Sequence, residues 1–310
     1  MGNVRLEGER VAVTGASGFV GSHLALALSA AGAEVTGVVR SPARARWLAE
    51  RGVALRQADL ADAQALERAF QGATAVVANA ALGSNQGSLE ELVRVNTTGV
   101  RHTLMAAARA GVTRVVYISS VAVYRNRPRV WLKEDAEQVD TRVTSPWRRR
   151  WVVSDLTTDW RYSLSKARAE ELAFSEAERL GIELTSLRPG PVYGSRDPKL
   201  TARLRRRLRL PLLVVPSVGV PLVHAGDVAL AAVSALARPH TAREAYHLAA
   251  PPVPLSEVYR TLIRVAGGGP RVVTLPVPLW VGFDTRKAER DLGFEPRSLE
   301  EGLREALSEG

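Results

Sequence analysis

The chain has 310 residues, of which 46% are hydrophobic and 24% charged, and its formal net charge is +10. This composition is typical of a folded globular protein, and the absence of cysteine excludes disulfides, thiol catalysis and cysteine-ligated metal centres. The charged N-terminal segment lacks the pattern of a signal peptide, and no apolar run reaches about 18 residues, so we expect a cytoplasmic protein without a membrane span. No nucleic-acid motif accompanies the basic charge, so we do not expect a nucleic-acid partner.

A glycine-rich stretch dominates the first part of the chain. It reads T-G-A-S-G-F-V-G over residues 14–21, follows the apolar run Val11–Val13, and precedes a segment of good helix formers. Gly15, Gly18 and Gly21 lack Cβ atoms, so the backbone there can turn sharply, approach a pyrophosphate and pack helix on strand. The N-terminus of the helix that follows also suits phosphate. The alternative interpretation is an ordinary tight turn in an α/β protein.

Strand and helix patterns alternate through the first 118 residues. Such alternation predicts an α/β fold of the Rossmann type, with a doubly wound parallel sheet and helices on both of its faces. The predicted strands cover 11–13, 35–39, 53–55, 75–80 and 112–118. The predicted helices cover about 22–31, 42–51, 62–70 and 88–110.

The end of the second predicted strand bears on cofactor choice. Arg40 lies 19 residues after Gly21, where dinucleotide folds place the residue that meets the adenosine ribose. An acid there favours NAD, whereas an arginine can pair with the 2′-phosphate of NADP, with assistance from Ser41 and Arg44. We therefore predict NADP and leave NAD open, because Arg40 could also be a solvated surface residue. At the next strand end, Asp59 is either a helix cap or an adenine contact.

Three residues further along suggest acid–base chemistry. Tyr162 and Lys166 are spaced i, i+4, which places them on one helix face, and Ser120 ends a strand at the ligand-binding edge of the sheet. A phenol with a pKa near 10 is a weak acid–base catalyst at neutral pH. A neighbouring ammonium, together with the positive nicotinamide of an oxidised cofactor, should favour the phenolate and lower that pKa. A serine hydroxyl can hold the substrate oxygen.

Together these motifs resemble an extended short-chain dehydrogenase/reductase, the group also called NAD-dependent epimerases/dehydratases. The resemblance covers nearly the whole chain, and its motifs come in the order of the family. The matching segments are T-G-A-S-G-F-V-G at 14–21, Asp59-Leu60, Y-I-S-S-V-A-V-Y at 117–124, Y-S-L-S-K at 162–166, L-R-P-G-P-V-Y-G at 187–194, P-L-V-H-A-G-D-V-A at 221–229 and D-T-R-K-A-E-R-D-L-G-F-E-P at 284–296.

The resemblance implies roles for individual residues. Tyr162 would be the proton donor or acceptor, Lys166 would bind the nicotinamide ribose, and Ser120 would hydrogen-bond the substrate oxygen. It also implies a homodimer formed through the helices near 88–110 and 162–180. The implied cofactor-binding residues are Gly15, Ser17, Gly18, Phe19, Val20 and Gly21 at the pyrophosphate, Arg40, Ser41, Asp59 and Leu60 near the adenosine, Asn79 and Ala80 along the channel, Tyr162 and Lys166 at the ribose, and Pro189, Gly190 and Val192 near the nicotinamide.

The chain also departs from the family pattern. Asn79 stands where many extended members have histidine, and Pro191 stands where sugar-nucleotide epimerases commonly have asparagine. The second difference favours reductases that act on ketones, aldehydes or sterol-like alcohols. The connection at 125–161 is longer than usual, and we interpret it as an inserted loop, either a lid over the substrate or a surface elaboration. Its tryptophans and arginines are Arg142, Trp147, Arg148, Arg149, Arg150, Trp151, Trp160 and Arg161, with Pro146 among them.

The C-terminal part should form a smaller lobe. We predict a dinucleotide-binding domain over 1–190, to which 222–250 returns, and a substrate lobe from 191–221 and 251–310. The arginines between 203 and 209 are either an anion-binding patch or a solvated helix face. His224 and Asp227 belong to the family's H-x-x-D segment, which usually fastens the lobe to the nucleotide domain. The five histidines lack ligand spacing, so no metal site is expected.

The sequence therefore predicts an NADP-preferring oxidoreductase that acts on a small molecule, with Tyr162 as acid or base. The first alternative is a nucleotide-sugar epimerase or dehydratase, in which the cofactor is reduced only transiently. The second is a non-catalytic NADP(H)-binding sensor or assembly protein.

Overall fold

The computed structural model describes residues 4–84, 86–124, 130–142, 159–277 and 279–308. Its main element is a seven-stranded parallel sheet with the strand order β12-β7-β5-β4-β1-β2-β3. The strands are β1 (Arg10–Thr14), β2 (Glu34–Val39), β3 (Ala54–Gln57), β4 (Ala75–Ala78), β5 (Arg114–Ile118), β7 (Glu183–Pro189) and β12 (Ala245–Leu248). This confirms the predicted doubly wound α/β fold.

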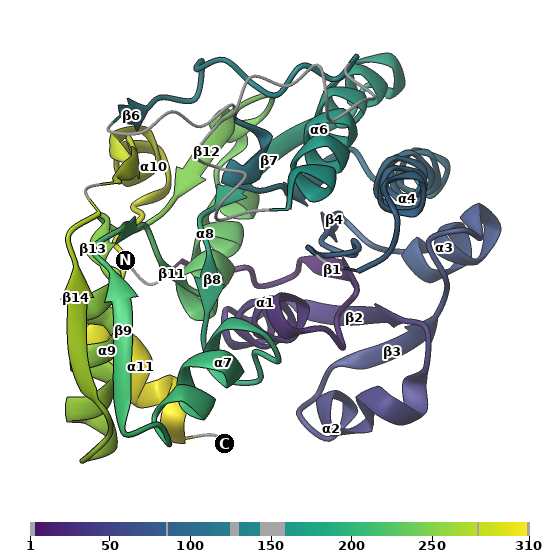
Figure 1. The fold of residues 1–310 in the computed structure, drawn as a ribbon. Helices are drawn as coiled ribbons and strands as arrows, with labels where there is room; N and C mark the ends of the chain where they lie inside the picture. Colours follow the sequence, from purple (N-terminus) through teal and green to yellow (C-terminus); the bar gives the residue numbers. More distant parts are fainter. Residues whose placement is uncertain (1–3, 85, 125–129, 143–158, 278, 309–310) are drawn as a thin grey trace.

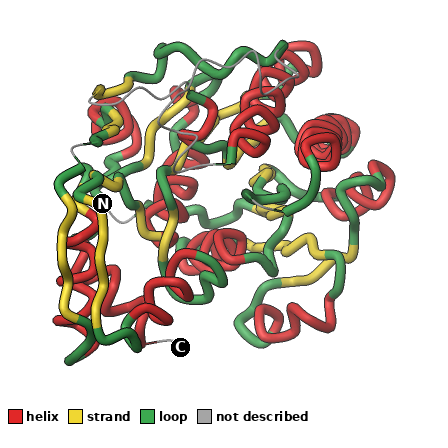
Figure 2. The backbone as a smooth tube through the Cα atoms, in the orientation of Figure 1, coloured by secondary structure: helices red, strands yellow, loops and turns green. Residues whose placement is uncertain are grey.

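Helices cover both faces of this sheet (Figures 1 and 2). Successive residues of the strands point to opposite faces, so Val11 and Val13 belong to one buried cluster and Ala12 belongs to the other. The first face packs against α1 (Phe19–Ala30) and α8 (Ala225–Ala237), and the second against α3 (Ala63–Phe70), α4 (Leu89–Arg109) and α6 (Trp160–Leu180). The strands are therefore buried on both sides, as is typical of parallel sheets.

The strand order sets where a ligand can bind. The chain runs from β1 outward to β2 and β3, and then returns to the other side of β1 with β4. At such a reversal the connections on the two sides diverge, which leaves a crevice beyond the carboxyl ends of β1 and β4. The glycine-rich turn, Asn79 and Ala80 all follow these two strands.

A smaller group of elements lies beside the sheet (Figure 1). Its buried cluster includes Leu204, Leu213, Tyr259, Leu262 and Leu303. The group contains α7 (Leu200–Arg207), β9 (Leu212–Pro216), α9 (Leu255–Ala266), β14 (Arg271–Leu275) and α11 (Leu299–Ser308), and β9 pairs with β14 in parallel.

The remaining elements are short. The paired strands are β8 (Val192–Tyr193) with β11 (Val223–His224), β10 (Gly219–Val220) with β13 (Val253–Pro254), and β6 (Val130–Leu132) with β15 (Val281–Phe283). The helical segments are α2 (Arg46–Ala49), α10 (Arg286–Leu292), and the 3₁₀ turns η1 (Pro42–Ala45), η2 (Val121–Val123) and η4 (Pro239–Thr241).

Two predicted helices differ from the structure. The helix expected at 42–51 is a 3₁₀ turn over Pro42–Ala45 followed by the four-residue α2, and the chain turns at Gly52, whose φ is +84°. The first helix begins at Phe19 rather than at residue 22, so it starts inside the glycine motif. No helix of the described residues is long and apolar enough to cross a membrane.

Candidate functional site

The glycine-rich turn joins β1 to α1, and its tight fold requires glycine at positions 15 and 21. Gly15 has φ +67°, and a Cβ atom there would lie 3.0 Å from the Cα atom of Ala80. A Cβ atom on Gly21 would lie 2.0 Å from the carbonyl oxygen of Gly15. The turn is therefore folded tightly against the end of β4, as a close backbone approach to a dinucleotide requires.

The N-terminus of α1 is suited to an anion. Its N-cap is Gly18, which offers no side-chain cap, and its first turn contains no acidic residue. In contrast, α4 is capped by Ser88 and α6 by Asp159. The first-turn N–H groups of α1 have no intrahelical partner, and together with the helix dipole they favour a negatively charged group. These features fit the pyrophosphate of a dinucleotide, next to Ser17, Phe19 and Val20.

Thr14 fastens the two strand ends at the crevice. Its hydroxyl accepts hydrogen bonds from the backbone N–H groups of Asn79, at 3.0 Å, and Ala80, at 3.1 Å. The Asn79 amide nitrogen is also 3.4 Å from the Thr14 carbonyl oxygen. The structure therefore brings Gly15, Asn79 and Ala80 together. Sequence analysis missed Thr14, although its position as the first residue of the glycine motif could have indicated it.

Arg40 and Ser41 follow β2 at the same edge of the sheet. Arg40 is exposed, and within the described residues no carboxylate lies within 4.0 Å of its guanidinium group. Its carbonyl oxygen accepts a hydrogen bond from the Gln57 side chain at 3.1 Å, which ties the end of β2 to β3. An exposed, unpaired guanidinium at this position fits a phosphate on the adenosine ribose.

Asp59 and Leu60 lie near the next strand end. The Asp59 carboxylate accepts a hydrogen bond from the N–H of Ala61 at 2.9 Å, while the cap of α3 is Asp62. Asp59 therefore shapes the turn before the helix, and the interpretation of Asp59 as the helix cap is wrong. The Leu60 carbonyl oxygen lies 2.8 Å from Nδ1 of His102, which fixes this turn to α4.

Lys166 is buried on α6 and reaches the end of β5. Its Nζ donates hydrogen bonds to the Tyr117 hydroxyl, at 3.1 Å, and to the Ile118 carbonyl oxygen, at 2.9 Å. Burial lowers the pKa of Lys166 to about 8, although the negative charge of Glu170 opposes the shift. The ammonium is therefore held immediately before Ser119 and Ser120. Tyr117 is a contact that sequence analysis did not assign.

Ser120 and Tyr162 meet at this edge. Burial raises the pKa of the Tyr162 phenol, and the nearby Ser120 hydroxyl opposes this shift with a smaller lowering effect. Lys166 is not among the groups that lower this pKa, because its ammonium is bound to Tyr117 and Ile118. The lowering expected from an oxidised nicotinamide stays a prediction. The phenol is protonated at neutral pH, which is the form that donates a proton.

A buried asparagine connects the crevice to the helix that carries Tyr162. Asn96 on α4 accepts a hydrogen bond from the N–H of Leu82 at 2.8 Å, and its amide donates to the Leu82 carbonyl and, at 3.0 Å, to the Ser165 hydroxyl. Ser165 in turn donates to the Tyr162 carbonyl oxygen at 2.8 Å. The loop after β4 and the first turn of α6 are therefore held together by one side chain.

The end of β7 forms another side of the crevice. A Cβ atom on Gly190 would lie 2.3 Å from the Pro221 carbonyl oxygen, so the backbones approach closely there. Pro189 and Gly190 are buried, and Val192 begins β8. Behind them Arg188 forms a buried ion pair with Glu170 at 2.9 Å, which links β7 to α6 one turn beyond Lys166. This pair fixes the helix on which Tyr162 and Lys166 lie.

Part of the predicted insertion lies in the described residues. β6 pairs in parallel with β15, so this segment contacts the C-terminal part of the chain, and Trp131 is 64% exposed. Trp160 and Arg161 begin α6 rather than forming a lid, and Arg142 is exposed. The remaining members of the predicted lid, from Pro146 to Trp151, lie outside the described residues.

The H-x-x-D segment connects α8 to the C-terminal group. Nδ1 of His224 accepts a hydrogen bond from the N–H of Gly226, and burial lowers the pKa of His224 to about 3, so the ring is neutral. The Asp227 carboxylate accepts from Arg297 at 2.8 Å, and Arg297 also pairs with Glu305 of α11. The expected fastening role is thus visible as an ion-pair cluster. No group of three potential metal ligands occurs among the described residues.

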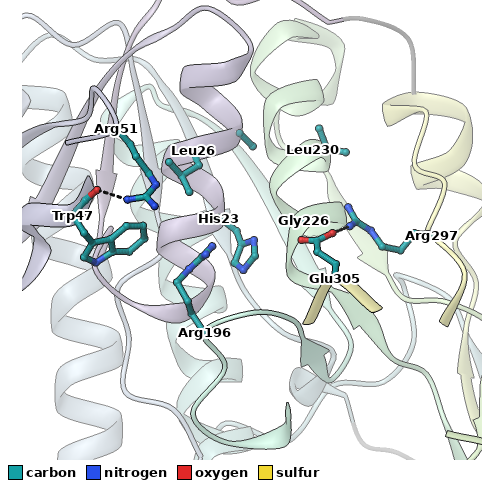
Figure 3. Close-up of a pocket in the computed structure, with 10 residues that line it drawn as sticks. His23, Leu26, Trp47, Arg51, Arg196, Gly226, Leu230, Arg297 and Glu305 are labelled. Atoms are coloured by element: carbon teal, nitrogen blue, oxygen red, sulfur yellow. Dashed lines mark hydrogen bonds and ion pairs between the residues drawn. The ribbon is translucent and has the colours of Figure 1, made fainter. Parts of the chain in front are cut away.

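A cavity of about 790 Å³ lies elsewhere, on the outer side of α1 and α8 (Figure 3). His23 and Leu26 line it from α1, and Trp47, Arg196 and Arg297 from its margins. None of the predicted site residues lines this cavity. We therefore place the candidate active site at the crevice between the glycine turn, Ser120 and Tyr162, and not in this cavity.

Comparison with known proteins adds independent information. The model of the NAD dependent epimerase/dehydratase family matches residues 11–249. The chain is 31% identical to cinnamoyl-CoA reductase 1 of Oryza sativa subsp. japonica, over 97% of this chain and 90% of that protein. It is 28% identical to 2-alkyl-3-oxoalkanoate reductase of Stenotrophomonas maltophilia, over 95% of this chain and 97% of that protein. A solved UDP-glucose-4-epimerase from Stenotrophomonas maltophila has the same fold, with a TM-score of 0.82 at 21% identity over 97% of each chain.

Proposed function

Because the chain belongs to the NAD dependent epimerase/dehydratase family, we propose that it is an NADP-preferring oxidoreductase that reduces a ketone or aldehyde, or oxidises the corresponding alcohol. The observation that carries this proposal is the meeting of Ser120 and Tyr162 at the sheet edge, with the buried Lys166 one helical turn away. The uncapped N-terminus of α1 and the tightly folded glycine turn support a dinucleotide beside them.

The three residues divide the chemistry between them. The bound dinucleotide would supply the hydride for a carbonyl carbon. The Ser120 hydroxyl would hold the carbonyl oxygen, and Tyr162 would give that oxygen its proton. Burial keeps the phenol of Tyr162 protonated at neutral pH, which suits the reductive direction. Lys166 would contribute a fixed positive charge next to the reacting groups, since its ammonium is anchored to β5.

Two observations favour net reduction over epimerisation. Pro191 occupies the position at which sugar-nucleotide epimerases commonly have asparagine. The two relatives compared above over nearly the whole chain are named as reductases of a thioester and of an oxoalkanoate. Both names describe carbonyl compounds, so we propose a carbonyl substrate for this enzyme as well. Epimerase activity is the outcome that would displace this proposal.

The proposal predicts that Tyr162→Phe binds NADPH with nearly unchanged affinity but loses activity. Removing a positioned proton donor costs roughly 10²–10⁴-fold in turnover. NADPH affinity by fluorescence titration and turnover on a panel of ketones, aldehydes and acyl thioesters measure the two effects. Tyr246→Phe is the matched control, because Tyr246 lies in β12 and its hydroxyl contacts Asp291 rather than the site. A Tyr162→Phe variant that keeps most of its activity would contradict the assignment.

The domain division, the oligomeric state and the cellular location are also proposals. We propose that residues 1–190 with 222–250 form the nucleotide-binding domain, and that 191–221 with 251–310 form the substrate lobe. We also propose a homodimer through the helices near 88–110 and 162–180, and a cytoplasmic location.

A further inference from the structure

One face of the small sheet formed by β9 and β14 is apolar and exposed. In β9, Leu213 and Val215 are buried, whereas Leu212 and Val214 are 48% and 53% exposed. The alternation of a strand thus places one set of side chains in the core and the other set outside. No other described residue covers the exposed side chains of Leu212 and Val214. β9 and β14 lie at the margin of the molecule in Figure 1.

The register of the two strands makes this a continuous surface. Val214 is paired with Val273 and Pro216 with Leu275, and Val273 and Leu275 are 39% and 48% exposed. Leu210, which precedes β9, is 46% exposed. We call Leu210, Leu212, Val214, Val273 and Leu275 the outer apolar face. Contiguous apolar side chains of this kind on a surface mark a site of interaction.

Arginines extend the outer apolar face at one end. Arg271 is the register partner of Leu212 and is exposed on the same face, and Arg209 is next to Leu210. Arg203 and Arg206 lie on α7, six and three residues before Arg209, and both are exposed. Among the described residues, none of these four guanidinium groups lies within 4.0 Å of a carboxylate.

We propose that the outer apolar face and its arginines bind the surface of an anionic lipid bilayer. Aliphatic side chains can enter the interface between headgroups and acyl chains, while exposed arginines contact the headgroup phosphates. The positive charge of the arginines is therefore complementary to the negative charge of an anionic bilayer. The proposal concerns a surface separate from the site of Ser120 and Tyr162, and it does not depend on the proposed reaction.

Other occupants of this face fit less well. A second copy of the chain related by a two-fold axis would present the same face, which offers no negative charge to Arg209 and Arg271. The face also contains no tyrosine or tryptophan, the aromatic residues that commonly anchor a protein partner alongside arginine. A bilayer needs neither a complementary shape nor an aromatic anchor.

The test uses the full-length protein and vesicles of phosphatidylcholine, with and without phosphatidylglycerol, in a sedimentation assay. We expect binding only to the vesicles with phosphatidylglycerol, and weaker binding at high salt. Val214→Asp should abolish binding, because it places a carboxylate in the apolar face. The double variant Arg209→Gln with Arg271→Gln should weaken it roughly thirtyfold, if each arginine near the surface contributes as in other basic segments.

Controls separate this effect from misfolding. Leu230→Asp alters an apolar side chain of similar exposure, 40%, on α8, and should leave vesicle binding unchanged. Circular dichroism and NADPH affinity should be the same for all variants. The proposal is overturned if the wild type binds neither kind of vesicle, or if Val214→Asp binds as tightly as the wild type. It is also overturned if Val214→Asp converts a dimer to a monomer in a protein that does not bind vesicles, because the face would then join two copies.

Discussion

At the scale of single residues, the candidate site contains a buried ammonium group, that of Lys166, whose burial is unfavourable. Lys166 is 2% exposed, and its ammonium is held by one phenol and one backbone carbonyl rather than by a carboxylate in direct contact. A buried ammonium without a direct ion pair is destabilising, which is why the pKa of Lys166 is lowered to about 8. Buried groups with shifted pKa values of this kind are typical of functional sites, which agrees with the role proposed for Lys166.

This predicts a specific pH dependence for the variant Lys166→Met. Between pH 8 and the ordinary pKa of 10.5, the unfolded chain binds a proton at Lys166 that the folded chain does not. The stability of the wild type should therefore rise with pH across this window, by up to about 3 kcal/mol relative to Lys166→Met. Urea denaturation of both proteins at pH 7, 8, 9 and 10 measures the difference. A constant difference would show that the folded-state pKa of Lys166 is not lowered.

Cofactor preference also belongs to this scale. Arg40→Asp replaces an unpaired guanidinium with a carboxylate at the end of β2, so it should repel a 2′-phosphate and accept a ribose hydroxyl. We expect NADPH affinity to fall by about ten- to a hundredfold and NADH affinity to stay equal or improve. The matched control is Arg46→Asp, which changes an exposed arginine on α2. Tighter binding of NADH than NADPH by the wild type would refute the assignment of Arg40.

At the scale of elements, the crevice is held by contacts between segments far apart in the sequence. Asn96 joins α4 to the loop after β4 and to α6, and the Arg188–Glu170 pair joins β7 to α6. Both side chains of this ion pair are almost fully buried. The positions of Tyr162 and Lys166 therefore depend on these contacts as well as on the helix that carries them.

We expect Asn96→Ala to lose stability and activity together. The variant removes three hydrogen bonds and leaves buried partners unsatisfied, which should cost roughly 2–4 kcal/mol. A small displacement of α6 should also reduce kcat by roughly ten- to a hundredfold. Thr97→Ala is the neighbouring control, since within the described part of the chain the Thr97 hydroxyl donates only to the Val93 carbonyl of its own helix. Equal stability of the two variants would show that Asn96 does not hold these elements.

Sequence reasoning predicted the parts of this site that depend on local spacing. The glycine turn and the Tyr162–Lys166 pair follow from intervals of three and four residues, and the strands follow from apolar runs. The partners of Lys166 could not be predicted in this way, because Ile118 lies 48 residues earlier in the chain. The raised pKa of Tyr162 could not be predicted either, because it results from burial of the phenol in the folded structure. The broken helix after Ser41 was missed because its apolar pattern resembles that of a continuous helix.

At the scale of the whole molecule, different surfaces carry different properties. The crevice lies at the carboxyl edge of the main sheet, the outer apolar face lies on the C-terminal group, and the ion-pair cluster of Asp227, Arg297 and Glu305 joins that group to α8. We therefore expect that the proposed catalysis and the proposed lipid binding can be altered independently. Several of the chain's arginines lie near the outer apolar face, so part of the net charge of +10 is located beside this surface.

The central claim is that the crevice catalyses net hydride transfer to a carbonyl compound. It is tested most directly by incubating the wild-type enzyme with NADPH deuterated at nicotinamide C4 and the panel of ketones, aldehydes and acyl thioesters. We expect deuterium at the new carbinol carbon and one NADP⁺ formed per alcohol, or two NADP⁺ and one released thiol per alcohol where an acyl thioester is reduced fully. Failure of every carbonyl compound to oxidise NADPH, together with conversion of a nucleotide sugar without net cofactor change, would contradict it.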